Sequence, residues 1–255
     1  MHIVHGTDLV PAFARGAALA IGNFDGVHRG HQALIRTAIE TARDLGRPSG
    51  VMVFEPHPRT FFAPNEPHFS LTPLPEKLRV LETFGLEIAV VLPFDGGLAA
   101  LPADKFIGDI LVRALGVSHV VIGYDFFFGS KRGGSPATMI AAGSRHGFGV
   151  SVIEPVAEAG EVFSSSEIRL KLAQGDVTGA AQAMGRAWRV TGRVIGGAKR
   201  GTGMGFPTAN VPMPPGTALG HGIYAVRAIV DGEAHDAAAY LGTRPTFDGG
   251  SPVLE

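Results

Sequence analysis

Two histidines, His28 and His31, are the side chains of this sequence whose type and spacing best suit chemistry on a phosphate group. They lie three residues apart in the glycine-containing segment 22–31, so their side chains share one face if a helix begins there. The first N–H groups of a helix carry partial positive charge. Two imidazoles beside them can stabilise charge that moves along a triphosphate. The segment therefore predicts a phosphate site in which both histidines are catalytic.

A metal site is the main alternative for this histidine pair, because zinc often uses histidines at similar spacing. No third ligand is evident in the neighbouring sequence, whereas the glycines let the main chain approach phosphate closely. Phosphate is therefore the favoured ligand. The further residues expected to bind it here are Gly22, Asn23, Phe24, Gly26 and Gly30.

The elements that must position this segment alternate between strand-like and helix-like patterns. Apolar runs typical of buried strands occur at residues 17–21, 51–54, 88–92, 117–122 and 150–153. Helical patterns occur at residues 34–45, 75–84, 103–115 and 139–146. This alternation predicts an α/β, Rossmann-like domain with a mostly parallel sheet. Ligands of such sheets bind at the carboxyl ends of the strands, and the histidines directly follow the first strand.

Two helical regions carry more detailed expectations. The first helix should carry Leu34, Ala38, Ala42 and Leu45 on one face and end at a glycine, residue 46. The region 165–184 reads as two short helices with a break near residues 175 and 176.

The pattern changes after Trp188. Short strand-like pieces at residues 188–195, 208–211, 224–230 and 237–241 are separated by glycine and proline clusters. This spacing is typical of a small antiparallel β-barrel. A boundary near Gly185 then divides the chain into domains 1–185 and 186–255.

A second candidate phosphate site lies in the glycine-rich segment 192–207, where Lys199 and Arg200 precede Gly201. Main-chain N–H groups and cationic side chains of such a loop can wrap phosphates. The segment lacks the Gly-Lys-Ser/Thr ending of a P-loop, and a plain glycine-rich hairpin is the alternative. Thr208 and Asn210 alternate onto one face of the following strand, where two oxygens can hold Mg²⁺.

Composition narrows the classes of function. With 45% hydrophobic and 18% charged residues, the 255-residue chain can bury real cores. The absence of cysteine excludes disulfides, thiolate metal sites and a cysteine nucleophile. A net charge of −1 argues against nucleic acid as the main partner, and no apolar run is long enough to span a bilayer. We expect a cytoplasmic protein with small-molecule partners and no membrane partner; self-association is left open.

The segment 22–31 resembles the H-x-G-H motif of the nucleotidyltransferase superfamily, and in particular its flavin branch. That branch comprises the prokaryotic bifunctional riboflavin kinase/FMN adenylyltransferases, also called FAD synthetases. Three further segments resemble motifs of this family, with Ser166 standing where threonine is usual: residues 53–58, 122–129 and 163–169.

This resemblance implies that AMP is transferred in line from ATP to FMN, giving FAD and pyrophosphate. It implies that Arg169 joins His28 and His31 in stabilising charge on the leaving pyrophosphate. The hydroxyls of Ser164, Ser165 and Ser166 would bind ATP phosphates, with a purely helix-capping role as the alternative.

The flavin is expected near Asp125, Phe126 and His57, which follow the fourth and second strands. For Phe126 the alternative is a place in the core. For His57 the alternative is a hydrogen-bonded turn residue between two prolines.

The Pro-Thr-Ala-Asn segment after the glycine-rich loop resembles the riboflavin kinase domain of the same family. It implies that Thr208 and Asn210 bind Mg²⁺ with ATP, and that Glu255 is the base that activates riboflavin for phosphorylation to FMN. Glu255 is also the last residue, and glycine stands at residue 196 where the family often has histidine. From the sequence we therefore expect an incomplete barrel and little kinase activity.

Two other functions are compatible with part of the sequence. A nucleotidyltransferase acting on another phosphate, such as phosphopantetheine, would lack the second, Pro-Thr-Ala-Asn domain. A non-catalytic flavin-binding or regulatory protein would not need His28, His31 and Arg169 together. Both are therefore disfavoured.

Overall fold

The computed structural model describes the chain except for residues 159, 197–207, 215 and 244–251. Its internal contacts divide it into two compact units, Met1–Glu66 with Thr72–Ser165, and Pro67–Leu71 with Ser166–Glu255. This division groups nearly all of the region 165–184 with the second unit, whereas the sequence pattern groups it with the first. The domain boundary near Gly185 stays a prediction.

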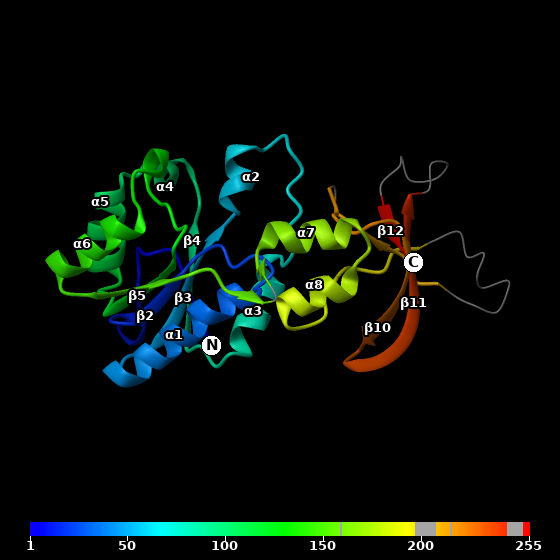
Figure 1. The fold of residues 1–255 in the computed structure, drawn as a ribbon, viewed down its shortest axis with the longest axis horizontal. Coiled ribbons are helices and arrows are strands. Elements are labelled where there is room, and N and C mark those ends of the chain that lie inside the picture. Colours follow the sequence, from blue (N-terminus) through cyan, green and yellow to red (C-terminus); the bar gives the residue numbers. More distant parts are fainter. Residues whose placement is uncertain (159, 197–207, 215, 244–251) are drawn as a thin grey trace. The chain divides into compact units, whose positions relative to one another are not determined.

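The first unit is built on a six-stranded parallel sheet with the strand order β1-β4-β3-β2-β5-β6 (Figure 1). The strands are β1 His2–His5, β2 Ala18–Ile21, β3 Ser49–Glu55, β4 Ile88–Pro93, β5 His119–Gly123 and β6 Gly149–Ile153. The predicted parallel sheet is confirmed. The edge strand β1 was not predicted, because only Val4 of its four residues is buried and no apolar run marks it.

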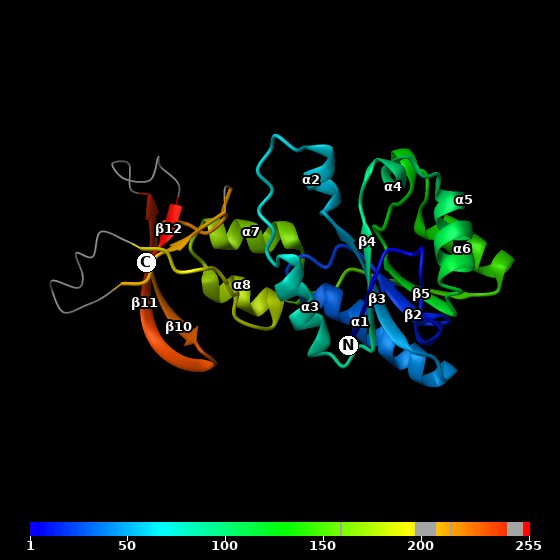
Figure 2. The ribbon, with the colours of Figure 1, turned by 180° about the vertical axis from the view of Figure 1, so that it is seen from behind.

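Alternate strand residues point to opposite faces of this sheet, and each face has its own apolar core. On one face, Val51 and Val53 of β3 pack with residues of the helices α1 and α3. On the other face, Met52 and Phe54 pack with residues of the π-helix η2 and of α6. Figures 1 and 2 show the sheet between these two layers of helices.

The helices of the first unit include most of those predicted. They are α1 Arg29–Leu45, α2 Pro58–Phe62, α3 Leu74–Glu82, α4 Gly96–Ala100, α5 Ala103–Lys105, η2 Phe106–Ala114 and α6 Pro136–His146, with short 3-10 turns η1 Ala12–Ala14 and η3 Ser130–Arg132. The single helix predicted at 103–115 is instead a short α-helical turn followed by a π-helix, which still buries its apolar side chains.

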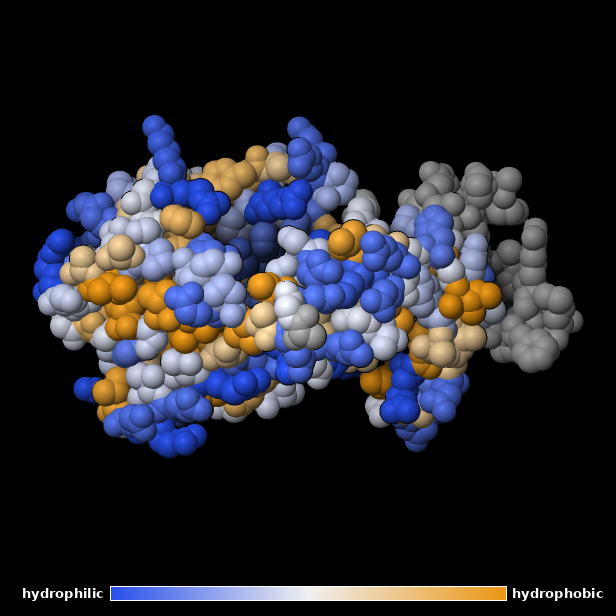
Figure 3. Space-filling model, in the orientation of Figure 1, coloured by the Kyte–Doolittle hydropathy of each residue, from blue (hydrophilic) through white to orange (hydrophobic). Residues whose placement is uncertain are grey.

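Helix α1 is amphipathic, as predicted. Leu34, Ala38 and Ala42 are buried, and Figure 3 shows hydrophilic side chains over the outer face of the helix. The helix ends at Gly46, whose φ of 59° is the left-handed conformation that glycine adopts without strain. Leu45, expected on the same face, is 49% exposed, because it lies in the last turn of the helix.

A short hairpin that was not predicted follows β6. Its strands are β7 Ala157–Glu158 and β8 Glu161–Val162, which pair antiparallel.

The two predicted helices are present as α7 Ser165–Ala173, whose first residue belongs to the first unit, and α8 Val177–Met184 in the second unit. Gly175 breaks them with a φ of 78°, and the Asp176 side chain accepts a hydrogen bond from the Gly179 N–H at 2.8 Å. The carboxylate thereby caps α8.

The remaining strands form an antiparallel sheet with the order β10-β11-β12-β9, which confirms the predicted antiparallel pairing. The strands are β9 Val211–Pro212, β10 Gly222–Val230, β11 Glu233–Thr243 and β12 Pro252–Leu254. The strand predicted at 188–195 is wrong: only Ile195 pairs, in an isolated bridge with Asn210. Gly192 interrupts that segment, and glycine weakens strands. The strand predicted at 208–211 begins at Val211 instead.

Candidate active site

The histidine pair lies at the amino end of α1, directly beyond the carboxyl end of the central strand β2. His28 is the N-cap residue: its Nδ1 accepts a hydrogen bond from the His31 N–H at 3.3 Å. The two rings stack with centroids 3.6 Å apart and planes 24° apart. Because Nδ1 of His28 accepts this bond, the neutral ring carries its proton on Nε2. Both predicted histidines thus form one unit at a helix N-terminus.

Glycine at position 30 allows this packing. A Cβ atom there would lie 3.0 Å from Cε1 and Nδ1 of His28 and 3.3 Å from the carbonyl oxygen of Phe163. Few real Cβ contacts are that close, so a side chain at Gly30 would displace the His28 ring or the nearby main chain. Gly30, which is predicted to let the main chain approach phosphate, therefore also leaves room for the His28 ring.

The loop before α1 holds an unusual main-chain conformation. Phe24 and Val27 have φ values of 48° and 41°, and Gly26 has a φ of 82°. A positive φ is rare for a β-branched residue such as valine and persists only where the surroundings hold it. The Phe24 ring is fully buried and lies 5.2 Å from the His31 ring between centroids. The predicted phosphate contact of Phe24 would therefore come from its main chain.

Side chains from distant segments hold this loop. The Asp25 carboxylate accepts hydrogen bonds from the Thr72 N–H at 3.0 Å and the Thr72 Oγ1 at 3.4 Å. Thr72 Oγ1 accepts from the Gly26 N–H at 2.8 Å, and Ser165 Oγ donates to the Asp25 carbonyl at 2.8 Å. Gln32 Nε2 donates to the Val27 carbonyl at 3.0 Å. The role of Thr72 could not be predicted from the sequence, because it is 46 residues from Gly26.

Arg29, between the two histidines, turns to the hairpin β7–β8. Its guanidinium forms an ion pair with Glu158 and lies 4.8 Å above the centre of the Phe163 ring. Sequence reasoning passed over Arg29, although a cation in the first turn next to the histidines could have drawn attention to it.

The serines and the arginine of the segment 163–169 divide between the units. Ser164 and Ser165 close the first unit, and the Ser165 hydroxyl holds the loop main chain. Ser166 and Arg169 belong to the second unit. There Arg169 Nε donates to the Phe69 carbonyl at 2.9 Å, and its Nη2 is 3.5 Å from Nε2 of His68. The place of Arg169 beside the histidine pair stays a prediction.

The predicted flavin residues follow β5 and β3 at the same carboxyl edge. Asp125 is exposed, and the half-buried Phe126 stacks on the buried Phe128 with ring centroids 5.4 Å apart. His57 caps α2, its Nδ1 accepting from the Arg59 N–H at 3.1 Å. This hydrogen bond agrees with the alternative interpretation of His57 as a turn residue. A contact between His57 and the flavin stays a prediction.

An aromatic cluster that the sequence reasoning missed lies at the carboxyl ends of β3 and β4. Phe61, Phe62 and Phe94 meet edge to face, with ring centroids 5.3 to 5.7 Å apart, and Phe54 contacts Phe94 at 6.1 Å. Phe62 is 66% exposed. The adjacent phenylalanines at 61 and 62 could have indicated this cluster from the sequence, because two aromatic residues just after a strand suit a planar ligand.

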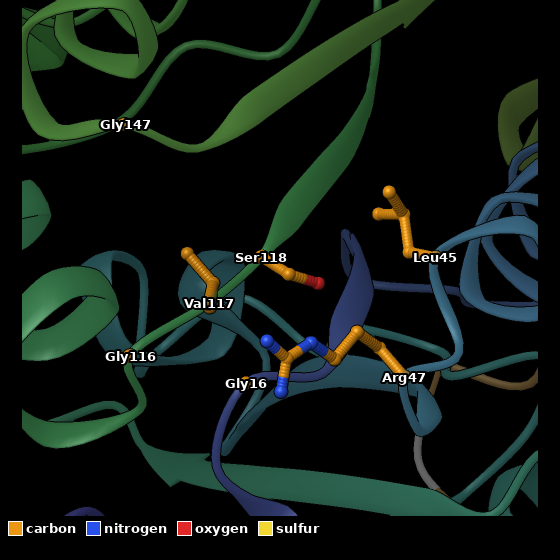
Figure 4. Close-up of a pocket in the computed structure, with 7 residues that line it drawn as sticks. All are labelled: Gly16, Leu45, Arg47, Gly116, Val117, Ser118 and Gly147. Carbon is orange, nitrogen blue, oxygen red and sulfur yellow. The ribbon is translucent and has the colours of Figure 1, made fainter.

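A hollow of about 470 Å³ lies at the opposite, amino edge of the sheet. Figure 4 shows Arg47 and Ser118 on its walls, with the glycines that precede β2, β5 and β6. The histidine pair follows β2 and therefore lies at the other edge. Ligands of open α/β sheets bind at the carboxyl ends of the strands, so the hollow is a poor candidate for the reacting groups.

In the second unit, Asn210 is buried and its main chain pairs with Ile195, whereas Thr208 is exposed and precedes the strand. The predicted alternation of these two residues along one strand is therefore wrong.

The main chain of Glu255 forms two hydrogen bonds with that of Tyr240. Each residue's N–H donates to the carbonyl oxygen of the other at 2.8 Å. The predicted phosphate residues Lys199, Arg200 and Gly201 lie outside the described residues.

Comparison with known proteins gives two family matches. The FAD synthetase family matches residues 10–167, which contain the histidine pair. The riboflavin kinase family matches residues 184–255.

Curated relatives match along nearly the whole chain. A bifunctional riboflavin kinase/FMN adenylyltransferase from Escherichia coli K12 is 39% identical over 257 residues, covering 100% of this chain and 82% of the relative. The protein of the same name from Bacillus subtilis is 37% identical, covering 97% of this chain and 78% of the relative.

Among solved structures, the crystal structure of a macrolide-efflux protein from Streptococcus pneumoniae matches with a TM-score of 0.84 and 27% identity. The match covers 99% of this chain and 83% of that one. Within the part of the chain that the structure describes, no helix has the length and apolar character to cross a membrane.

Proposed function

The chain belongs to the family of bifunctional riboflavin kinase/FMN adenylyltransferases, and we propose that its adenylyl transfer takes place at His28 and His31. The protein is an ATP-dependent transferase of FAD biosynthesis. It transfers AMP from ATP to FMN, giving FAD and pyrophosphate, and it phosphorylates riboflavin to FMN with ATP. The low level of kinase activity expected from the sequence stays a prediction.

One observation carries the proposal: the stacked histidine pair caps α1 at the carboxyl end of the central strand. Helix N-termini attract phosphates through unpaired N–H groups and the helix dipole. Imidazole N–H donors placed there act on charge that develops in the transition state. The site has the donors that phosphoryl chemistry needs, and the reaction requires no nucleophilic side chain.

In the mechanism we favour, an oxygen of the FMN phosphate attacks the α-phosphorus of ATP. The bond from this phosphorus to the bridging oxygen breaks on the opposite side, and pyrophosphate leaves. His28, through its Nε2–H, and His31 donate hydrogen bonds to the charge that builds on the phosphates, and Arg169 adds a positive charge. Most of the rate acceleration then comes from positioning and electrostatics.

The other residues of this site have binding roles in the proposal. The main chain of Gly22, Asn23, Phe24, Gly26 and Gly30 faces the triphosphate, assisted by the hydroxyls of Ser164, Ser165 and Ser166. The flavin lies by Asp125, Phe126 and His57. The exposed Phe62 at the same edge supports a planar ligand there.

We assign riboflavin phosphorylation to the second unit. Thr208 and Asn210 offer a hydroxyl and an amide oxygen, the hard donors that Mg²⁺ accepts, so the residues fit this ion. Mg²⁺ bound with ATP would offset the negative charge of its phosphates. Lys199, Arg200 and Gly201 would contact those phosphates, and Glu255 would accept the proton of the attacking riboflavin hydroxyl.

We further propose that the protein works in the cytoplasm on small molecules, without nucleic acid or membrane partners. Both reactions consume ATP, a cytoplasmic metabolite, and the near-neutral net charge gives no attraction to a polyanion.

The test is to incubate the chain with ATP, Mg²⁺ and FMN, and to measure FAD and pyrophosphate. A parallel reaction replaces FMN by phosphopantetheine. Equal amounts of FAD and pyrophosphate from FMN alone support the proposal. Transfer to phosphopantetheine without FAD would overturn it.

A further inference from the structure

Thr72 is a buried threonine that contacts two successive residues of the loop before the histidine pair. Its Oγ1 accepts a hydrogen bond from the Gly26 N–H at 2.8 Å and donates to the Asp25 carboxylate at 3.4 Å. The main-chain N–H of Thr72 donates to the same carboxylate oxygen at 3.0 Å. One hydroxyl therefore acts as donor and acceptor at once, which a methyl group cannot do.

These hydrogen bonds lie away from water, since Thr72 and Asp25 are only 3% and 2% exposed. A hydrogen bond to a carboxylate is stronger than one between neutral groups, and a low local dielectric strengthens it further. Removing the hydroxyl takes one partner from a buried N–H and one from a buried carboxylate, which is unfavourable. Thr72 thus fixes the positions of Asp25 and Gly26.

The helix that follows Thr72 holds it in place. α3 begins at Leu74, two residues further on, and packs with its buried residues in the same apolar core as Phe24 and Val27 of the loop. This packing keeps the start of α3 beside the loop. The Thr72 hydroxyl is thereby held within reach of Gly26 and adds a directional contact to the apolar one.

The loop needs such support because its main chain is strained. Phe24 and Val27 have φ values of 48° and 41°, in the left-handed region that disfavours bulky side chains. Conformations of this kind persist only where the surroundings hold them. His28 follows Val27 directly and caps α1, and its ring stacks on that of His31. A relaxation of the loop would therefore shift both rings.

We propose that Thr72 is a positioning residue for adenylyl transfer: its hydroxyl fixes the loop at Asp25 and Gly26 and thereby the place of His28 and His31. This inference rests on the proposed function of the histidine pair. Thr72 acts through the loop in this account and touches neither ATP nor FMN. The hydroxyl is the group required, so serine should replace threonine here and valine should not.

The experiment compares five full-length proteins: wild type, Thr72→Val, Thr72→Ser, Thr72→Cys and Thr83→Val. Valine keeps the shape of threonine without the hydroxyl, and serine keeps the hydroxyl without the methyl group. Cysteine offers a thiol, which is a weak donor and a weak acceptor. Thr83 is the matched control, because its Oγ1 donates to the Val80 carbonyl at 2.6 Å at the end of α3, outside the loop. Steady-state kinetics of FAD formation and thermal unfolding are measured for each protein.

We expect Thr72→Val to lower kcat for FAD formation by about tenfold to a hundredfold, because small misplacements of reacting groups have effects of that order. The KM for FMN should change by less than about threefold, since no contact with FMN is lost. Thr72→Ser should keep kcat within about threefold of the wild type, and Thr72→Cys should fall at least about fivefold below Thr72→Ser. Thr83→Val should match the wild-type kcat, even if its unfolding midpoint falls.

A wild-type kcat for folded Thr72→Val would overturn the inference, and so would an equal loss of kcat in Thr72→Ser. The first result would mean that the hydroxyl stabilises the fold alone, and the second that the methyl group is what the site requires. If Thr72→Val fails to fold, Thr72→Cys and Thr72→Ser decide: a lower kcat with cysteine supports the inference, and an equal kcat contradicts it. Failure of the proposed function is distinguishable, because His28→Ala would then retain FAD synthesis.

Discussion

His28 has two roles at the scale of a single residue. Its Nδ1 caps α1 by accepting from the His31 N–H, and its ring supports the ring of His31 at 3.6 Å. One side chain therefore fixes the helix start and the second histidine. A substitution at either histidine should affect the reaction more than the fold, since α1 keeps its buried apolar face.

We expect His28→Ala and His31→Ala each to lower the rate of FAD formation by about a hundredfold or more, the usual effect of losing a donor to developing charge. Steady-state assays with ATP and FMN provide the measurement. His146→Ala, at an exposed histidine near the end of α6, is the control and should be unchanged. Near-normal FAD synthesis in both active-site variants would refute the assignment.

The histidine pair could be predicted from the sequence because its spacing is local. The side chains that hold the loop could not, because their partners are distant: Thr72 and Asp25 are 47 residues apart, and Ser165 and Asp25 are 140 apart. No expectation for Lys77, a buried lysine of α3, followed from the sequence, because its burial depends on tertiary packing.

At the scale of the element, the amino end of α1 depends on Gly30. We expect Gly30→Ala to lower FAD formation at least about tenfold, because its Cβ would push against the His28 ring. Alanine has a higher helix propensity than glycine, so a change in helix propensity should not lower the unfolding midpoint of Gly30→Ala.

The matched control for Gly30→Ala is Gly96→Ala in the first turn of α4, where a Cβ meets nothing within 4 Å. Assays and thermal unfolding of both variants provide the measurement. Unchanged FAD formation by Gly30→Ala would contradict this prediction, because it would mean that the His28 ring can move without loss of activity.

The strand pair β5–β6 carries a pH-dependent contact. His119 Nε2 lies 2.9 Å from Ser151 Oγ, and burial lowers the pKa of His119 below its ordinary value of 6.5. The folded state then binds the proton less well than the unfolded chain. The contribution of His119 is complete above about pH 6.5 and is lost as the pH falls through the lower folded-state pKa.

We therefore expect the free energy of unfolding to fall more steeply in the wild type than in His119→Gln as the pH is lowered from about 7.5 to about 5. Urea unfolding at a series of pH values gives this comparison. Parallel pH dependence of the two proteins would contradict the account of His119.

Most elements were predictable because their apolar periodicity is plain, as in β3, all but one of whose residues are buried, and in α1. Strand β1 could not be predicted, because its own sequence has no strand-like pattern. It is a strand because it pairs with β4, more than 80 residues away. The strand predicted at 188–195 had suitable apolar residues, but only Ile195 found a partner.

At the scale of the whole molecule, we assign the two activities to separate units, so they should be separable by substitution. We expect Thr208→Ala to lower riboflavin phosphorylation by about tenfold or more, because an oxygen expected to hold Mg²⁺ is lost. FAD formation from added FMN should stay within about twofold of the wild type, since the change leaves the histidine site intact.

Both reactions of Thr208→Ala are measured on the same sample, with Mg²⁺ varied. Because Thr208 is exposed, loss of fold should not confuse the result. A parallel fall of both activities would mean that the two sites are not independent.

The most direct measurement follows the phosphorus atoms of ATP during reaction with FMN. The wild type and the double variant His28→Ala/His31→Ala are each incubated with FMN, Mg²⁺ and ATP labelled either at the α- or at the γ-phosphate. The account predicts that α-label enters FAD, that γ-label leaves in pyrophosphate, and that the double variant loses the transfer. γ-Label in the flavin product formed from FMN, or undiminished α-label transfer by the double variant, would contradict it.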